Sequence, residues 1–135
     1  MKYDIHITQA AEKDLNSAAD YIEFVLHSPQ AADALLDEAE RTISDLSTFP
    51  ERFNLVDDPV LKAWGIRFTP IKNYIAFYVI SKDHRTVYIV RFLYGKRDWI
   101  TIVNYSAIEL PSIRLAQPKA VQLLGASMTP LLLSL

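Results

Sequence analysis

The sequence has no cysteine among its 135 residues. This absence excludes disulfide bonds, thiolate nucleophiles and cysteine-ligated zinc, and it is typical of proteins that live in a reducing compartment. The first residues, from Met1 to His6, lack the apolar stretch of a secretory signal. We therefore expect a cytoplasmic protein.

Glycine, histidine and long apolar runs are also scarce. With three glycines, the chain contains neither a glycine-rich phosphate loop nor a Gly-x-Ser-x-Gly elbow, which argues against a nucleotide-binding enzyme and a serine hydrolase. His6, His27 and His84 are scattered without ligand spacing, so we expect no metal and no cofactor. No apolar run reaches the roughly 18 residues of a membrane span, and no membrane partner is expected.

Acidic residues are few in the second half of the chain. Residues 1–60 hold 4 Lys/Arg and 13 Asp/Glu, a net charge of −9, whereas residues 61–135 hold 10 Lys/Arg and 3 Asp/Glu, a net charge of +7. One explanation is that solvated helix faces are often acidic. The other is a basic surface on the second half that meets an anionic partner.

The hydrophobic pattern predicts an α+β domain in the order β-α-α-β-β-β. A helix-type repeat follows Thr8 as far as His27, and Ser28-Pro29 starts a second helix that ends at Phe49-Pro50. A period of two predicts the strands, in residues 2–8, 63–68, 74–80 and 86–94. Residues 51–63 are expected to be a polar connection. These elements predict a helical hairpin packed on a small, mainly antiparallel sheet.

The C-terminal part of the sequence differs from the rest. We divide the chain into a domain of residues 1–103 and an atypical C-terminal extension of residues 104–135. Within the extension, Gln117 to Leu124 is compatible with a short helix, and Leu131 to Leu135 is apolar. This apolar end would dock on the domain, meet a second subunit or simply extend the chain, and the sequence does not choose among these.

Cations and tyrosines gather around the ends of the last strands. Arg67 and Arg91 lie late in two strands, and Arg91 is followed closely by Tyr94. A guanidinium among apolar residues requires an acceptor, which is either an anionic ligand or a local carboxylate such as Asp98. Trp99 is expected to fill the core. Three further cations lie at strand ends, namely Lys72, Lys96 and Arg97.

The element order, the Trp64-Gly65-Ile66-Arg67 strand and the terminal run from Arg91 to Trp99 resemble the RelE/ParE superfamily of bacterial toxin–antitoxin toxins. The resemblance covers about residues 2–103. It implies a helical hairpin on a sheet and neutralisation by an antitoxin. It also implies one of two activities, namely metal-independent cleavage of messenger RNA on the ribosome or inhibition of DNA gyrase without nuclease chemistry, in modules of the plasmid-stabilisation type.

In the nuclease interpretation, which the sequence slightly favours, Arg67 and Arg91 match the strand arginines of the family and converge on the scissile phosphate. Tyr94 stands where many relatives have histidine, and a tyrosine with a pKa of about 10 is a better acid than base at neutral pH. Glu51 and Lys72 are the possible bases. Lys72, Lys96 and Arg97 would bind the ribosome and messenger RNA.

Two alternatives remain open. A gyrase inhibitor needs only a shaped, cationic surface, and the missing histidine and low net charge favour it. A degenerate member would bind an antitoxin and have no toxic target.

Overall fold

The computed structural model describes residues 2–108, together with the side chains of residues 2–103. Its strands are β1 (Asp4–Ile7), β2 (Arg67–Ile71), β3 (Tyr74–Ser81) and β4 (Thr86–Tyr94). Its helices are α1 (Gln9–Asp20), α2 (Pro29–Asp45), α3 (Pro59–Ala63) and α4 (Trp99–Ile108), with a π turn η1 (Tyr21–Val25) and a 3-10 turn η2 (Pro50–Arg52). None of the helices within residues 2–108 is long and apolar enough to cross a membrane.

The four strands form one sheet in the order β1-β4-β3-β2. The β2–β3 and β3–β4 pairs are antiparallel, and β1 joins the free side of β4 in parallel. The predicted α+β class and mainly antiparallel sheet are thus confirmed.

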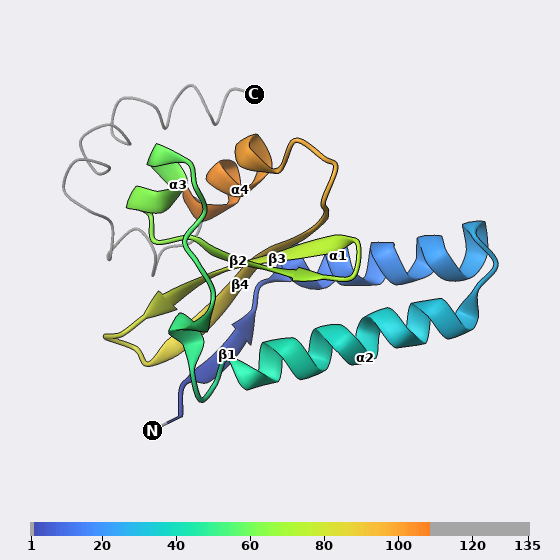
Figure 1. Cartoon of the computed structure of the whole chain (residues 1–135), viewed down its shortest axis with the longest axis horizontal. Coiled ribbons are helices and arrows are strands. Elements are labelled where there is room, and N and C mark those ends of the chain that lie inside the picture. The colour runs from blue at the N-terminus through green and yellow to red at the C-terminus, as the bar shows by residue number, and fades with distance from the viewer. Residues whose placement is uncertain (1, 109–135) are drawn as a thin grey trace.

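The helical hairpin also forms as predicted. The Thr8 hydroxyl accepts a hydrogen bond from the Ala11 N–H at the start of α1, and Ser28 caps α2 through the Ala31 N–H. Between the helices, His27 takes a positive φ of 56°, which reverses the chain. Figure 1 shows the hairpin extending beyond the sheet, so that the turn between α1 and α2 lies past the end of the sheet.

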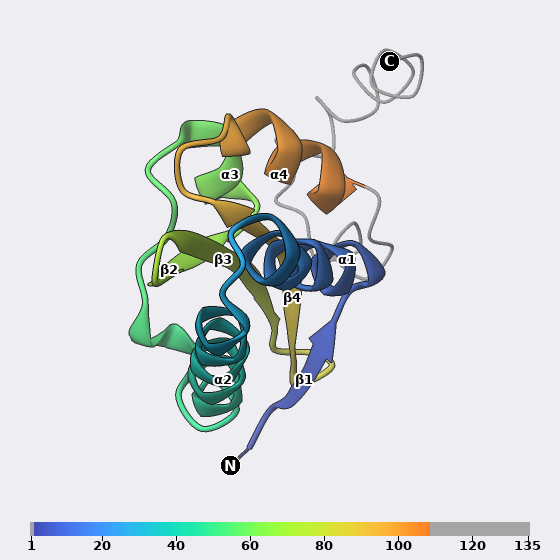
Figure 2. The same ribbon diagram turned by 90° about the vertical axis from the view of Figure 1, so that its right-hand side faces the viewer.

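Two apolar cores lie on opposite faces of the sheet. Leu35 and Ile43 of α2, together with Leu46 just after it, pack with Ile89 of β4 and Tyr78 of β3 under the hairpin. The second core is covered by α3 and α4, and Figure 2 shows these helices and α2 on opposite sides of the sheet. Trp99 belongs to this second core, where its ring centroid lies 5.2 Å from that of Phe77, as expected for a core residue.

Several boundaries differ from the prediction. The connection between residues 51 and 63 contains η2 and α3, and the second strand begins at Arg67 instead of residue 63. Pro70 lies inside β2, which is tolerated because β2 is an edge strand. The unpredicted α4 runs across the expected boundary between residues 103 and 104. The short helix predicted at Gln117 to Leu124 lies outside the described residues.

Candidate functional site: a basic, aromatic cleft beside a neutralised arginine

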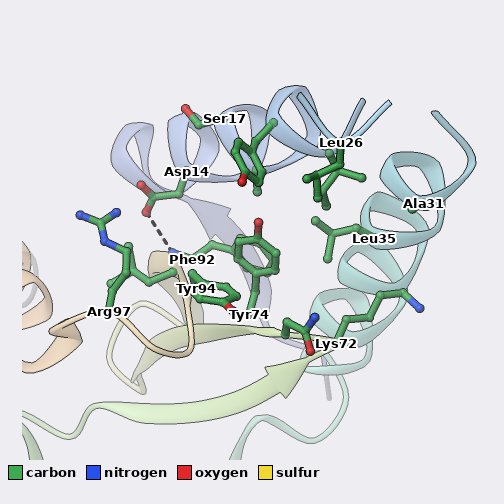
Figure 3. Close-up of a pocket in the computed structure, with 15 residues that line it drawn as sticks. Asp14, Ser17, Leu26, Ala31, Leu35, Lys72, Tyr74, Phe92, Tyr94 and Arg97 are labelled. Atoms are coloured by element: carbon green, nitrogen blue, oxygen red, sulfur yellow. Dashed lines mark hydrogen bonds between the residues drawn. The ribbon is translucent and has the colours of Figure 1, made fainter. Parts of the chain in front are cut away.

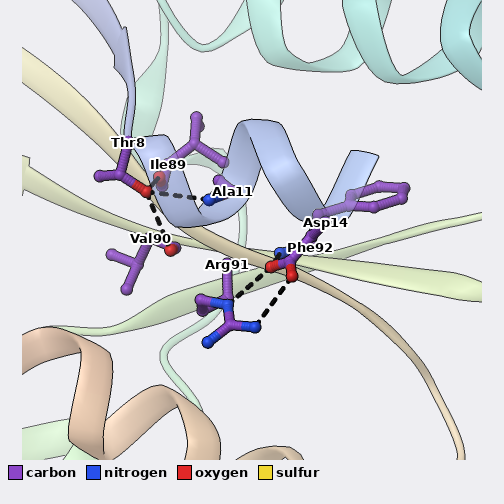
Figure 4. A network of polar contacts seen from close by, with 7 residues as sticks. All are labelled: Thr8, Ala11, Asp14, Ile89, Val90, Arg91 and Phe92. Carbon is purple, nitrogen blue, oxygen red and sulfur yellow. Dashed lines mark hydrogen bonds and ion pairs between the residues drawn. The ribbon is translucent and has the colours of Figure 1, made fainter. Parts of the chain in front are cut away.

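The edge of β4 beyond β1 is covered by helix α1. β1 ends at Ile7, opposite Ile89, but β4 continues to Tyr94. The Thr8 hydroxyl lies 2.8 Å from the carbonyl oxygen of Ile89 and 3.1 Å from that of Val90. Side chains of the helix and its cap thus replace the missing strand as hydrogen-bonding partners of β4 (Figure 4).

Asp14 of α1 holds Arg91 in a two-pronged ion pair. Arg91 Nε donates to Asp14 Oδ2 at 2.6 Å, and Arg91 Nη2 donates to Asp14 Oδ1 at 2.8 Å. The Phe92 backbone N–H donates to the same Oδ2 at 3.0 Å. Only 13% of the Asp14 side chain and 21% of the Arg91 side chain are exposed. The carboxylate therefore stands where an anionic ligand of Arg91 would have to bind (Figure 4).

Arg67 is engaged elsewhere. Its Nη1 donates to the carbonyl oxygen of Phe53 at 2.7 Å. In the sheet, Arg67 lies opposite Tyr78 of the hairpin-side core, whereas Arg91 lies opposite Phe77 of the other core. Directly opposed residues point to the same face of a sheet, so the two arginines project from different faces. Their predicted convergence on one hollow is wrong, because the β-bulge beside Phe77 shifts the register between these strands.

A cavity lies between the hairpin and the end of the sheet. It has a volume of about 840 Å³. Figure 3 shows α1 and the turn after it as one wall, α2 as the second wall, and the β2–β3 turn with the end of β4 as the floor. We call it the aromatic cleft, because four rings line it, those of Tyr21, Tyr74, Phe92 and Tyr94.

The rings of the cleft are packed against one another. Tyr74 stacks on Phe92 with centroids 5.2 Å apart and meets Tyr94 edge-on at 5.7 Å. Burial raises the pKa of Tyr74, and the neighbouring Tyr21 and Tyr94 raise it further, so its hydroxyl stays protonated at neutral pH. Tyr74 and Phe92 therefore offer a stacked aromatic floor with the Tyr74 hydroxyl at its edge.

Two exposed cations, Lys72 and Arg97, add positive charge to the cleft. Lys72 takes a positive φ of 56° in the turn between β2 and β3. Gly95 donates its N–H to the Asn73 carbonyl oxygen at 2.9 Å, and a Cβ on it would lie 3.3 Å from that oxygen. A glycine at this position thus lets the end of β4 approach the turn.

The predicted site residues therefore fall into separate places. Tyr94, Lys72 and Arg97 line the aromatic cleft, while Arg67 and Arg91 do not. Lys96 is exposed in the segment after β4, and Glu51 forms an ion pair with Lys82 at 3.7 Å. Within residues 2–103, no group of three or more histidines and acids is placed to hold a metal ion.

The apolar tip of the hairpin borders the cleft and was not predicted as part of a site. In the tip, Tyr21, Phe24, Val25 and Leu26 are between 51% and 65% exposed. The sequence placed these residues in a regular helix, whereas the π turn widens the helix at this point. π turns are frequent at functional sites, and a contiguous patch of exposed apolar residues on a protein surface marks a candidate interaction site.

Comparisons with known proteins agree with this architecture. The family described as "ParE toxin of type II toxin-antitoxin system, parDE" matches residues 5–99. The chain belongs to this family. None of the curated proteins matches the sequence.

Two solved structures share the fold of this ParE family member. One is the toxin–antitoxin complex RelBE2 from Mycobacterium tuberculosis, with 24% identity and a TM-score of 0.50 over 70% of this chain and 99% of that chain. The other is the chromosomal ParDE system from P. aeruginosa, with 16% identity and a TM-score of 0.58 over 70% of this chain and 98% of that chain. Both neighbours are thus matched almost end to end by part of this chain.

Tyr78 and Arg67 fasten the η2 segment to the sheet. The Tyr78 hydroxyl donates to the Pro50 carbonyl oxygen at 2.7 Å, next to the contact of Arg67 with Phe53. Burial raises the pKa of Tyr78 to about 12, although Arg67 opposes the shift. Folding is therefore coupled to the protonation of this hydroxyl.

This coupling predicts a loss of stability at alkaline pH. Because the pKa is near 10 in the unfolded chain and about 12 in the folded one, the contribution of protonated Tyr78 is complete below pH 10. It is lost as the pH rises from 10 towards 12, by about 1 to 2 kcal/mol. Urea unfolding of the wild type and Tyr78→Phe at pH 8 and pH 11 measures this loss of unfolding free energy. An equal pH dependence in both proteins would contradict the prediction.

Proposed function

We propose that this chain is the toxin of a type II toxin–antitoxin module and arrests growth by binding DNA gyrase, without cutting RNA. The observation that carries the proposal is the ion pair between Asp14 and Arg91. A carboxylate that already satisfies the guanidinium opposes the binding of a phosphate there.

The placement of the other candidate groups also supports binding over cleavage. RNA cleavage requires a base at the 2′-hydroxyl, cations at the phosphate and an acid at the leaving oxygen. Arg67 and Arg91 project from different faces of the sheet, and Glu51 pairs with Lys82. The aromatic cleft, by contrast, has the rings and rim cations that protein interfaces favour.

The cleft and the apolar tip would also receive the cognate antitoxin. The two structural neighbours are parts of toxin–antitoxin systems, which supports such a partner. Tyr74 and Phe92 would accept apolar side chains, and Lys72 and Arg97 would pair with acids. The antitoxin segment bound here would accordingly be amphipathic and acidic.

Two parallel assays test the proposed target. The purified chain should inhibit the supercoiling of relaxed plasmid by gyrase at stoichiometric concentrations, and prior addition of the antitoxin should restore supercoiling. In a translation extract, primer extension should find messenger RNA with intact ends. Undiminished supercoiling together with codon-phased cuts would overturn the proposal.

Ribosome-dependent cleavage of messenger RNA is the second candidate. It is favoured by one observation, the presence of Tyr94, Lys72 and Arg97 along the same cleft, where an acid and two cations would meet a backbone. The translation assay decides it, since Tyr94→Phe would then abolish the cuts. Inactivity in both assays would instead indicate a degenerate, antitoxin-binding member of the family.

A further inference from the structure

We infer that the part of the C-terminal extension beyond α4, residues 109–135 and called the extension from here on, covers the aromatic cleft and the apolar tip in the absence of a partner. The extension would act as an intramolecular competitor of the antitoxin and of the target. The competition rests on the proposed function, whereas the docking itself rests on the observations below.

The first observation is that the shared fold of the relatives is matched without the extension. The family match ends at residue 99, and the two neighbouring structures are covered to 99% and 98% by 70% of this chain. The extension is therefore additional to the shared domain. A segment beyond the shared domain is available for another contact.

The second observation is the composition of the extension. More than half of the residues from 109 to 135 are apolar, and only Glu109, Arg114 and Lys119 carry charge. Segments that stay solvated are rich in charge and poor in leucine, whereas this one has six leucines after residue 120, four of them between Leu131 and Leu135. Covering apolar surface with such a segment lowers the free energy of the protein in water.

The third observation is where the described part of the chain leaves apolar surface open. Among its ten exposed large hydrophobic residues, Tyr21, Phe24, Val25 and Leu26 are neighbours at the tip, and Tyr94 lies across the same cleft. The remaining exposed hydrophobic residues are spread over other elements. The tip and cleft thus form the most concentrated apolar target.

The length of the extension allows this contact. Twenty-seven residues reach up to about 90 Å when extended, whereas a domain of this size has a radius of gyration of about 13 Å. Tethering places the extension at an effective concentration in the millimolar range near every surface of the domain. Because the contact is apolar, it leaves Lys72 and Arg97 available to an acidic partner that displaces it.

The absence of cysteine makes a cross-linking test direct. In the full-length chain, Leu26→Cys is combined with Leu132→Cys, and the pair is treated with a short bismaleimide. The matched control combines Val60→Cys with Leu132→Cys. Val60 is 43% exposed on α3, which packs beside α4, so proximity along the chain favours the control.

We expect intramolecular cross-links to form at least about tenfold faster in the Leu26 pair than in the Val60 pair. Equal rates would overturn the inference, and cross-linked dimers would assign the cleft to a second copy of the chain instead. Adding Leu132→Asp and Leu133→Asp should raise the affinity for the antitoxin about tenfold if the covered form is favoured ten to one. The cross-linking result does not depend on gyrase or RNA, so it can fail or succeed independently of the proposed function.

Discussion

Replacing Asp14 by alanine is expected to lower the free energy of unfolding by about 3 kcal/mol. The substitution leaves Arg91 without its carboxylate and the Phe92 N–H without its acceptor, at a place where little of either side chain is exposed. A largely buried donor that loses its partner costs more than the net value of the bond. Chemical denaturation followed by circular dichroism measures the loss.

The matched control is Asp20→Ala, because Asp20 ends the same helix but is exposed. Its effect should stay within about 0.5 kcal/mol. A double-mutant cycle of Asp14→Ala and Arg91→Ala isolates the pair, and we expect a coupling of about 1 to 3 kcal/mol. Equal effects of Asp14→Ala and Asp20→Ala would show that the ion pair does not secure the helix.

Replacing Leu26 by aspartate is expected to weaken binding of the antitoxin by at least about thirtyfold. Leu26 lines the aromatic cleft and is 55% exposed, so the new carboxylate would be buried by the partner but not by folding. The cost of desolvating this charge falls on the complex alone. Isothermal titration calorimetry with the purified antitoxin measures the change.

Val60→Asp serves as the control for this second substitution. Val60 is an exposed aliphatic residue on α3, on the opposite side of the sheet from the hairpin-side core. Its substitution should change the affinity less than about threefold. If both variants bound equally well, the cleft would not be the antitoxin site.

The sequence predicted the helical hairpin and the succession of the four strands along the chain well, because both depend on local periodicity and, for the helices, on caps such as Thr8 and Ser28. The short helix α3 was missed. It has only five residues, and it is held by the Asp58 side chain and by burial of Leu61, which depends on tertiary packing. Helix α4 was missed because its residues are apolar or uncharged all round and show no amphipathic stripe.

The candidate site was predicted only in part. Tyr94, Lys72 and Arg97 were singled out because they lie at or near strand ends, and all three line the aromatic cleft. Asp14 was missed as the partner of Arg91, since 77 positions separate them in the chain. An acidic residue off the apolar stripe of a helix usually faces solvent, whereas Asp14 meets the edge of β4. One sequence gives no signal for such a long-range pair.

The hydrogen bonds that join α1 to β4 also bear on self-association. Strands with unpaired backbone groups recruit strands from other molecules, which leads to domain swapping and fibrils. The side chains of Thr8 and Asp14 already form hydrogen bonds with backbone groups of Ile89, Val90 and Phe92. An added strand would have to pair with these same groups. A strand could be added to the C-terminal half of β4 only if α1 first detached from it. Asp14, which neutralises Arg91, therefore also helps to keep neighbouring molecules from adding strands at this edge.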